Sequence, residues 1–227
     1  MFARMRAIRG LPKLVTRVKT RGWGEVGHLL KDRVREEIDS GDTLLFLVRS
    51  TQHDGLDIEG LTHRWAHPED ADRYARDIGT DSPSTFRSRL TRGTRCFLVE
   101  SEGRFVHASW VTTEGSWARE IRAYLVPPPN DAYIYESFTR ADARGRGIYP
   151  YALANILKSL HEEGIERAWI AVEEDNAASR RSIDKAGFTF AFAITYRRRW
   201  GRLRLEPPTG PDAAVGRSFI RHKSREK

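Results

Sequence analysis

Two glycines and two arginines stand immediately before a helical pattern in the second half of the chain. Gly145 and Gly147 carry no side chain where the backbone enters the helix, so the amide N–H groups there can point at a single anion. The helix dipole favours an anion at this end, and Arg144 and Arg146 add two full charges. Pro150 suits the first helical position, where no N–H donor is needed. The stretch predicts a phosphate-binding loop that fits a diphosphate.

The same stretch has a plainer interpretation, which is a strand-to-helix turn whose arginines lie in solvent. Only Gly145 and Gly147 fit the G-x-G-x-x-G pattern of dinucleotide-binding folds, because Pro150 stands at the third glycine position. The Gly-Lys-Ser/Thr of a nucleotide P-loop is missing as well. A nicotinamide or ATP site is therefore not predicted.

Strands and helices alternate around this loop. Leu153, Ile156, Leu157 and Leu160 repeat at helical spacing behind it, and Gly164 ends the pattern. The predicted strands are 44–48, 96–100, 104–113, 132–139, 168–173 and 188–197, and the predicted helices follow Pro68 and Ser82 and cover 150–163 and 177–186. This order indicates an α/β (α+β) protein with a mixed sheet and helices packed on it.

Two motifs along this part of the chain resemble those of the GNAT superfamily of acyl-CoA-dependent N-acyltransferases. The first is Arg144-Gly145-Arg146-Gly147-Ile148, after a strand. The second is Asn176-Ala177-Ala178-Ser179, which opens a helix that closes with Lys185-Ala186-Gly187-Phe188. The hairpin 96–113 also fits, and the resemblance covers roughly residues 42–200. It implies the GNAT fold, with a mixed, mostly antiparallel central sheet and helices on both faces.

The resemblance also implies acetyl-CoA or another acyl-CoA as co-substrate. The family pattern Arg/Gln-x-x-Gly-x-Gly/Ala matches Arg144 and Gly147, but Tyr149 departs from it, and its ring would narrow the approach to the diphosphate or line the acyl pocket. Backbone groups at the end of strand 132–139 would bond the pantetheine arm, and Asn176 has the alternative role of a helix N-cap. The expected cofactor contacts are Phe138, Thr139, Arg144, Gly145, Arg146, Gly147, Ile148, Tyr149, Asn176 and Ser179.

Acyl transfer to an amine needs the neutral amine as nucleophile. An amine like that of lysine has a pKa of about 10.4, so presenting it neutral at pH 7 costs roughly 4 to 5 kcal/mol, and a base helps. We predict Glu136 as this base, since Tyr133, Tyr135 and Phe138 would partly desolvate its carboxylate and raise its pKa. The alternative, given equal weight, is an edge carboxylate paired with an arginine. A backbone N–H near Phe138 or Thr139 would hold the oxyanion.

The leaving thiol needs less help, because expelling a thiolate at pH 7 is uphill by only about 2 kcal/mol. In many relatives a tyrosine of the second motif protonates it, and Ile183 stands at the matching position here. Water, another hydroxyl such as Tyr149 or Ser182, or no acid at all remain as alternatives.

The chain carries a net charge of +8, and its positive charge lies at the two ends. Residues 1–24 and residues 197–227 each carry +7, which leaves −6 for the part between them. We therefore divide the chain into a basic arm with an amphipathic helix (1–40), an acyltransferase domain (41–200) and a basic C-terminal tail (201–227). The N-terminal helical extension would cover the acceptor side or mediate a homodimer.

The basic ends have two interpretations. A charged strand exit with a mobile tail is favoured at the C-terminus, and contact of the arms with nucleic acid or an anionic membrane is less favoured. Within the acidic middle, the run 173–175 is interpreted as a solvated helix start, or alternatively as a group that attracts a cationic substrate.

Composition excludes several other classes. The longest apolar runs, 44–48 and 168–172, are far shorter than the roughly 20 residues of a membrane-spanning helix, and no secretory signal is predicted. Cys96 has no partner for an internal disulfide, which favours a reducing cytoplasm. The histidines lack metal-ligand spacing, so no metal is predicted. A serine triad is not predicted, because no Gly-x-Ser-x-Gly elbow occurs.

The sequence therefore predicts an N-acyltransferase that moves an acetyl or other acyl group to a primary amine. A small amine, an amino sugar, a peptide terminus and a protein lysine all remain as acceptors. Two alternatives stay open. Ile183 and Tyr149 are compatible with a catalytically degenerate CoA-binding module, and the basic arms with an acyltransferase that acts on an RNA-linked acceptor such as a charged tRNA.

Overall fold

The computed structural model describes residues 39–199 and 202–221. The chain divides into two compact units. The smaller unit comprises residues 1–41 and 197–204, and the larger unit comprises residues 42–196 and 205–227. Most of the predicted basic arm and its amphipathic helix, residues 1–38, lies outside the described residues, as does the end of the tail from residue 222. No helix of the described ranges is long and apolar enough to cross a membrane.

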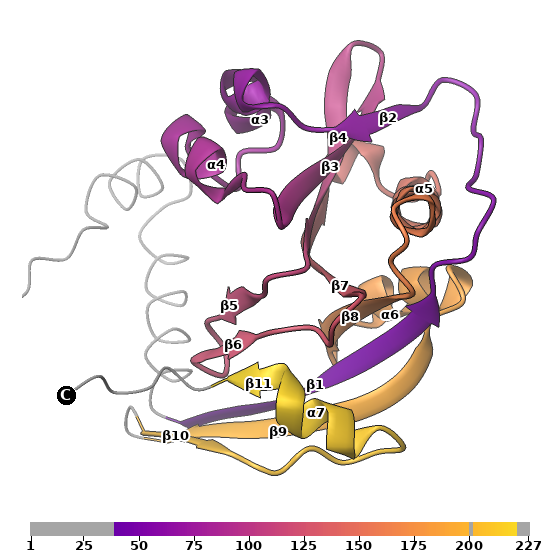
Figure 1. Cartoon of the computed structure of the whole chain (residues 1–227). Coiled ribbons are helices and arrows are strands. Elements are labelled where there is room, and N and C mark those ends of the chain that lie inside the picture. The colour runs from indigo at the N-terminus through magenta and orange to yellow at the C-terminus, as the bar shows by residue number, and fades with distance from the viewer. Residues whose placement is uncertain (1–38, 200–201, 222–227) are drawn as a thin grey trace, which may run out of the picture. The chain divides into compact units, whose positions relative to one another are not determined.

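The described residues form the following elements (Figure 1). The strands are β1 (Asp39–Ser50), β2 (Thr62–Trp65), β3 (Thr94–Ser101), β4 (Arg104–Thr112), β5 (Ser116–Ala118), β6 (Ala123–Leu125), β7 (Asp131–Thr139), β8 (Arg167–Glu173), β9 (Thr189–Arg199), β10 (Arg202–Leu205) and β11 (Ile220–Arg221). The helices are η1 (Pro68–Asp70), α3 (Ala71–Asp77), α4 (Pro83–Arg89), η2 (Ala141–Ala143), α5 (Ile148–Glu162), α6 (Ala177–Lys185) and α7 (Ala213–Phe219).

The central sheet of the larger unit runs in the order β9-β1-β8-β7-β4-β3-β2. The pairs β1–β8, β2–β3, β3–β4 and β4–β7 are antiparallel, and the pair β7–β8 is parallel. A second small sheet has the order β11-β6-β5. The prediction of a mixed, mostly antiparallel sheet is confirmed.

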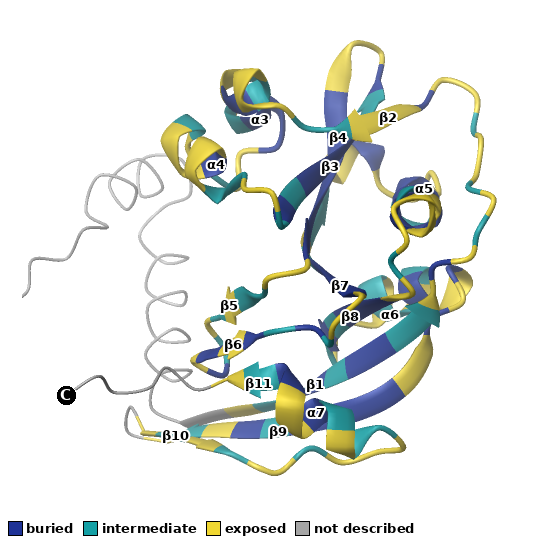
Figure 2. Cartoon of the chain, viewed as in Figure 1, coloured by how far each residue is buried: buried dark blue, intermediate teal, exposed yellow. Residues whose placement is uncertain are grey.

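Helices pack on both faces of the β3–β4 hairpin, with α3 and α4 on one side and α5 on the other (Figure 1). Side chains alternate accordingly along β3. Cys96 and Leu98 are buried in one apolar cluster with Tyr74 of α3, while Phe97 and Val99 join another with α5. The hairpin is therefore buried on both faces, as the dark colouring of β3 shows in Figure 2.

Strands β7 and β8 separate halfway along their length. Their parallel pairing covers only Asp131–Ile134 with Arg167–Ile170, and β8 continues paired to β1 on its other edge. The register of β7 with β4 shifts at the same place, so that Glu136 and Ser137 lie opposite the single residue Ser109. Such a bulge bends its strand. The sheet consequently opens beside the second half of β7.

The C-terminal segment differs from the prediction. Residues 213–221 form α7 and β11, and Ile220 pairs with Leu125 of β6. Phe219 is completely buried, with its ring centroid 5.5 Å from those of Phe46 and Trp169. The predicted mobile tail is wrong for this stretch, because the burial of one aromatic ring outweighs the surrounding charge.

We expect Phe219→Ala to lower the free energy of unfolding by about 3 to 5 kcal/mol, the usual cost of emptying a buried aromatic site. Urea unfolding followed by tryptophan fluorescence measures this. Phe190→Ala is the matched control, because Phe190 is 46% exposed and should change stability by less than about 0.5 kcal/mol. Equal effects of the two substitutions would show that α7 is not part of the core.

Candidate active site

Two cavities meet where β7 and β8 separate. The first, here called the loop cavity, has a volume of about 530 Å³ and is lined by the end of β7, the loop before α5, the start of α5 and one side of α6. The second, the hairpin cavity, has a volume of about 290 Å³ and is lined by the β5–β6 hairpin, β7 and β8. Four residues line both cavities, namely Ser137, Tyr149, Asn176 and Ser179.

The structure brings together nine of the ten predicted cofactor contacts. The loop cavity is lined by Phe138, Thr139, Arg144, Gly145, Gly147, Ile148, Tyr149, Asn176 and Ser179. The exception is Arg146, which is exposed and does not line this cavity. Asn176 also caps α6, since its Oδ1 accepts a hydrogen bond from the N–H of Ser179 at 3.1 Å.

The two glycines of the loop have left-handed backbone angles, with φ of +79° at Gly145 and +73° at Gly147. A side chain at Gly147 would meet only Ile58 at 4.0 Å, so the angle and not crowding requires glycine. Helix α5 begins directly after Gly147, two residues earlier than predicted, which places Pro150 third in the helix rather than first.

The backbone N–H groups of residues 145–149 donate to no backbone carbonyl within the described part of the chain. The first helical hydrogen bond there runs from the N–H of Tyr151 to the carbonyl of Gly147 at 3.1 Å. Residues at a helix start leave their N–H groups free in this way. The free donors and the positive end of the helix dipole make this loop suitable for an anion.

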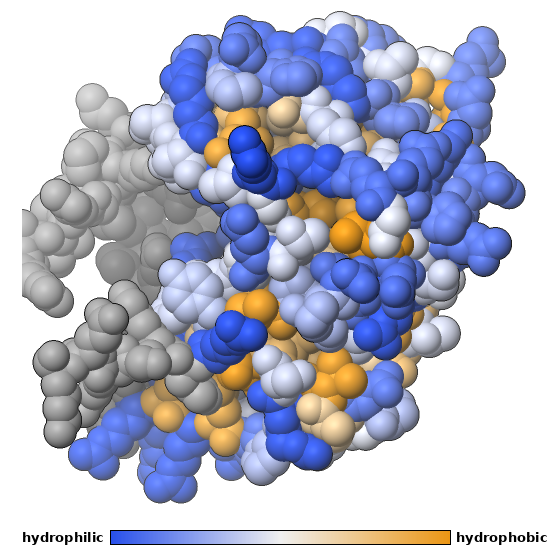
Figure 3. Space-filling view, viewed as in Figure 1, coloured by the Kyte–Doolittle hydropathy of each residue, from blue (hydrophilic) through white to orange (hydrophobic). Residues whose placement is uncertain are grey.

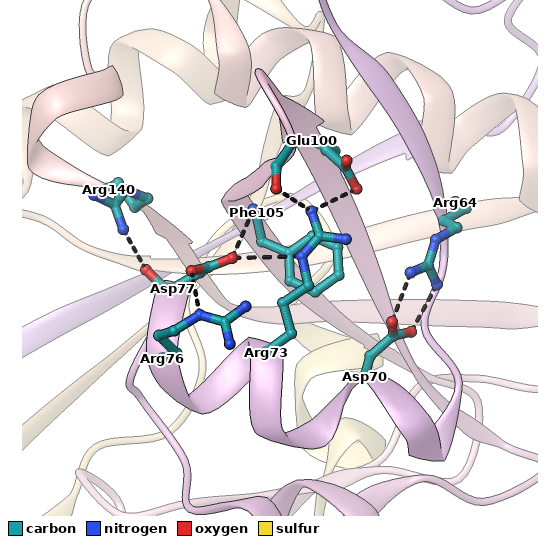
Figure 4. A network of polar contacts seen from close by, with 9 residues as sticks. Arg64, Asp70, Arg73, Arg76, Asp77, Glu100, Phe105 and Arg140 are labelled. Carbon is teal, nitrogen blue, oxygen red and sulfur yellow. Dashed lines mark hydrogen bonds and ion pairs between the residues drawn. The ribbon is translucent and has the colours of Figure 1, made fainter.

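Arg140, just before this loop, takes part in a network of polar contacts around Asp77 (Figure 4). Arg140 bonds the Asp142 carboxylate at 2.6 Å and the backbone carbonyl of Asp77 at 2.8 Å. The buried Asp77 carboxylate accepts the N–H of Phe105 at 3.1 Å, so α3 and the β3–β4 hairpin are joined at the same point. The loop is therefore held by a hairpin and a helix that precede it in the chain.

The two cavities carry opposite charges. Arg144, Arg181 and Lys185 line the loop cavity, and no carboxylate does. The hairpin cavity is lined by three carboxylates and one arginine, namely Glu120, Glu136, Glu173 and Arg119. One site is therefore suited to an anion, and its neighbour to a cation.

Glu136 lies in the hairpin cavity, but its environment differs from the prediction. Its side chain is 47% exposed, and its Oε2 lies 2.7 Å from Nη1 of Arg89. The carboxylate is paired with an arginine, as the alternative interpretation has it, and nearly half of its side chain remains exposed. Glu136 also has φ of +47°, a strained angle for a residue other than glycine, because it occupies the bulge of β7.

Glu173 is a second carboxylate of the hairpin cavity, and the sequence indicated it only as part of the run 173–175, not as a base. Burial raises its pKa, and the nearby carboxylates of Asp42, Asp175 and Glu120 raise it further. Glu173, Asp42 and Asp175 hold carboxylate oxygens within 4.8 Å of one another. The run of acids at the end of a predicted buried strand was the available signal. No sequence pattern indicated that Asp42, which is far away in the chain, lies beside Glu173.

Tyr149 stands at the junction of the two cavities. Its ring stacks on His107, with centroids 5.4 Å apart and an interplanar angle of 30°. Burial raises the pKa of the phenol, and the hydroxyls of Ser137 and Ser179 act in the opposite direction. Ile183, at the position of the usual acid, is fully buried and lines neither cavity.

An exposed aromatic pair stands at the β5–β6 hairpin. Trp117 and Tyr124 are 39% and 42% exposed, with ring centroids 5.2 Å apart, and Trp117 lines the hairpin cavity. On the face drawn in Figure 3, apolar residues form separate areas among hydrophilic ones. An exposed tryptophan beside carboxylates offers a flat apolar surface next to negative charge.

The model of the acetyltransferase (GNAT) family matches residues 57–188, more than half of the chain, and the chain belongs to this family. Similar solved structures include a GNAT-family protein from Novosphingobium aromaticivorans (18% identity, TM-score 0.51, 69% of this chain and 63% of that one). Another is a GCN5-related N-acetyltransferase from Sphaerobacter thermophilus (15% identity, TM-score 0.52, 83% of this chain and 67% of that one).

At these identities the likeness concerns the fold. The match spans less than two thirds of the first of these structures. No curated protein shows significant similarity to the chain.

We expect Gly147→Glu to abolish the thermal stabilisation of the protein by coenzyme A, because a carboxylate would project where the free N–H groups face an anion. Gly164→Glu is the matched control. Gly164 follows the other end of α5, has φ of +80° and also has room for a side chain, so it imposes a similar strain of about 1 to 2 kcal/mol. Differential scanning fluorimetry with and without coenzyme A separates the two. Retained stabilisation in Gly147→Glu would show that the diphosphate binds elsewhere.

Proposed function

We propose that this protein is an N-acyltransferase that moves an acetyl or other acyl group from acyl-CoA to a primary amine. GNAT proteins use acyl-CoA as co-substrate, and the family is established for residues 57–188. The observation that carries the proposal is the meeting of a cationic cavity and an acidic cavity at four shared residues. A polyanionic donor and a cationic acceptor would approach the same point from opposite sides.

The donor fits the loop cavity. The N–H groups of residues 145–149 would bind the diphosphate, and Arg144, Arg181 and Lys185 would add charge. The pantetheine arm would lie along the edge of β7 that β8 leaves free after Ile134, where the backbone of Phe138 and Thr139 lines the cavity. A backbone N–H of that segment would also stabilise the oxyanion.

The acceptor fits the hairpin cavity. An amine arrives as an ammonium, which the carboxylates Glu120, Glu136 and Glu173 would attract. Trp117 would contact the apolar or flat body of the acceptor. This arrangement favours an acceptor with more than one positive charge or with an aromatic or sugar body next to its amine.

The ammonium must lose a proton before it attacks. Glu136, predicted as the base, has one oxygen held by Arg89. Glu173 forms no ion pair within the described residues, and its raised pKa brings it closer to that of an effective base near neutral pH. These observations support Glu173 as the base and Glu136 as a fixed negative charge that orients the ammonium.

The chemical steps balance as follows. The base removes a proton from the ammonium, and the nitrogen lone pair forms a bond to the thioester carbon while the carbonyl electron pair moves to oxygen. The intermediate loses its second N–H proton, the carbonyl re-forms, and the C–S bond breaks with its electron pair on sulfur. The products are an amide and a thiol. Of the two protons that the nitrogen loses, one ends on the sulfur and the other is released to water through the base.

We expect Glu173→Gln to lower kcat for thiol release from acetyl-CoA by about 100-fold, the lower range for loss of a general base. Spermidine, glucosamine, an alanine-first peptide and a lysine peptide serve as acceptors. Glu174→Gln is the matched control, since Glu174 is exposed, carries the same charge and lines neither cavity. A larger loss in Glu136→Gln than in Glu173→Gln would assign the base to Glu136.

The pH dependence of thermal stability gives an independent test of the raised pKa of Glu173. Because its pKa is raised in the fold, the ionised form destabilises the protein, and this penalty appears as the pH rises from the ordinary value of 4.5 through the folded value. Glu173→Gln should therefore raise Tm at pH 7 and leave it unchanged at pH 4.

If coenzyme A binds but the wild-type protein releases no thiol with any amine, the protein is a CoA-binding module.

A further inference from the structure

The junction of the two cavities is where the sulfur of an acyl thioester must lie, since the donor fills one cavity and the amine reaches the carbonyl carbon from the other. This step rests on the proposed function. The four junction residues are Ser137, Tyr149, Asn176 and Ser179. Three of them carry hydroxyls, and a phenol is a much stronger acid than an aliphatic alcohol. Tyr149 is therefore the best proton donor at this point.

A chain of polar side chains, buried at its centre, leads away from the Tyr149 hydroxyl. Ser137 Oγ, which faces Tyr149, lies 2.7 Å from Ser109 Oγ. Ser109 Oγ lies 2.8 Å from Nε2 of His107, and Nδ1 of His107 lies 2.7 Å from the hydroxyl of Thr139. The chain thus joins β4 to β7 across the bulge and returns to the loop cavity.

Burial keeps the imidazole of this chain neutral, which leaves two possible directions for its hydrogen bonds. His107 and Ser109 are completely buried, and burial lowers the pKa of His107 to about 3, so its imidazole is neutral near pH 7. A neutral imidazole donates from one nitrogen and accepts at the other. If Thr139 donates to His107, then His107 donates to Ser109, Ser109 to Ser137, and Ser137 to the oxygen of Tyr149. In that arrangement the Tyr149 oxygen accepts from Ser137, and its own proton is available to Ser179 or to a group at the junction.

The other candidates for the acid are less well placed. The hydroxyl of Ser182 donates to the carbonyl of Ala178 at 3.2 Å within α6. Ser182 lines the loop cavity but not the hairpin cavity, so it does not lie at the junction. Ile183 lies in the core. The hydroxyl that the second motif lacks is thus supplied from the first turn of α5.

We propose that Tyr149 is the general acid that protonates the leaving thiolate, with Ser137, Ser109 and His107 as positioning residues. As the C–S bond breaks, its electron pair moves to sulfur, and the Tyr149 O–H proton is transferred to it. The phenolate that forms accepts the hydrogen bond of Ser137. It regains its proton through solvent from the base, which took that proton from the amine, so no external reactant is consumed.

The first test is Tyr149→Phe, assayed by thiol release from acetyl-CoA with the amines named above. We expect kcat to fall at least 100-fold, while KM for acetyl-CoA and the thermal stabilisation by coenzyme A stay within twofold of wild type. The matched control is Tyr151→Phe, because Tyr151 lies on the same helix with its hydroxyl on His63 and lines neither cavity. It should keep its kcat within twofold.

Two further variants separate acid catalysis from packing. Incorporation of 3-fluorotyrosine at position 149 keeps a phenol and should retain activity that phenylalanine loses. Ser137→Ala should lower kcat about tenfold with an unchanged KM for acetyl-CoA, and Ser137→Thr, which keeps the hydroxyl, should restore most of it.

Three outcomes would overturn the inference. Full kcat in Tyr149→Phe would show that water or no group serves as the acid. Loss of coenzyme A stabilisation in the same variant would show that the ring binds the cofactor instead. Absence of thiol release from the wild-type protein would refute the proposed function itself, and the role of Tyr149 with it, whereas the first two outcomes leave the proposed function intact.

Discussion

The end of the pairing between β7 and β8 is the constraint on which the site depends. Parallel strands normally share hydrogen bonds along their whole overlap, but here the pairing stops at Ile134 and Ile170. Backbone groups beyond that point need partners from water or a ligand. The bulge at Glu136 and Ser137 follows two residues later, and a bulge bends its strand. Both cavities and all four junction residues lie at this opening.

The sequence was informative where local rules determine structure. The apolar stripe of α5, the glycines at 145 and 147 and the hairpin of β3 and β4 follow from periodicity and backbone freedom, and the structure contains all of them. The start of α5 was misplaced by two residues because Pro150 was taken as the first helical residue. The helix α7 was missed because it has only seven residues in a strongly basic segment, and its buried Phe219 contacts rings distant in sequence.

The electrostatics of the site were harder to predict for the same reason. The partner of Glu136 is Arg89, which comes from α4, and the neighbour of Glu173 is Asp42, near the start of β1. Neither pair is close in sequence, and both depend on the strand order. The bulge also has no short signature, so the alignment of Ser109 with Ser137 follows only from the three-dimensional register. Cofactor contacts were easier, since they come mainly from one continuous loop and the cap of one helix.

Two departures from the family pattern have one physical explanation if Tyr149 is the acid. The family has a small residue at the position of Tyr149 and often a tyrosine at the position of Ile183. In this chain the small residue has become a phenol at the junction, and the tyrosine has become an aliphatic side chain in the core. Tyr149, from the first turn of α5, lines the same two cavities as Ser179 of α6. A ring at this junction would occupy volume beside the thioester, so the position of the acid and the width available to the acyl group would be coupled.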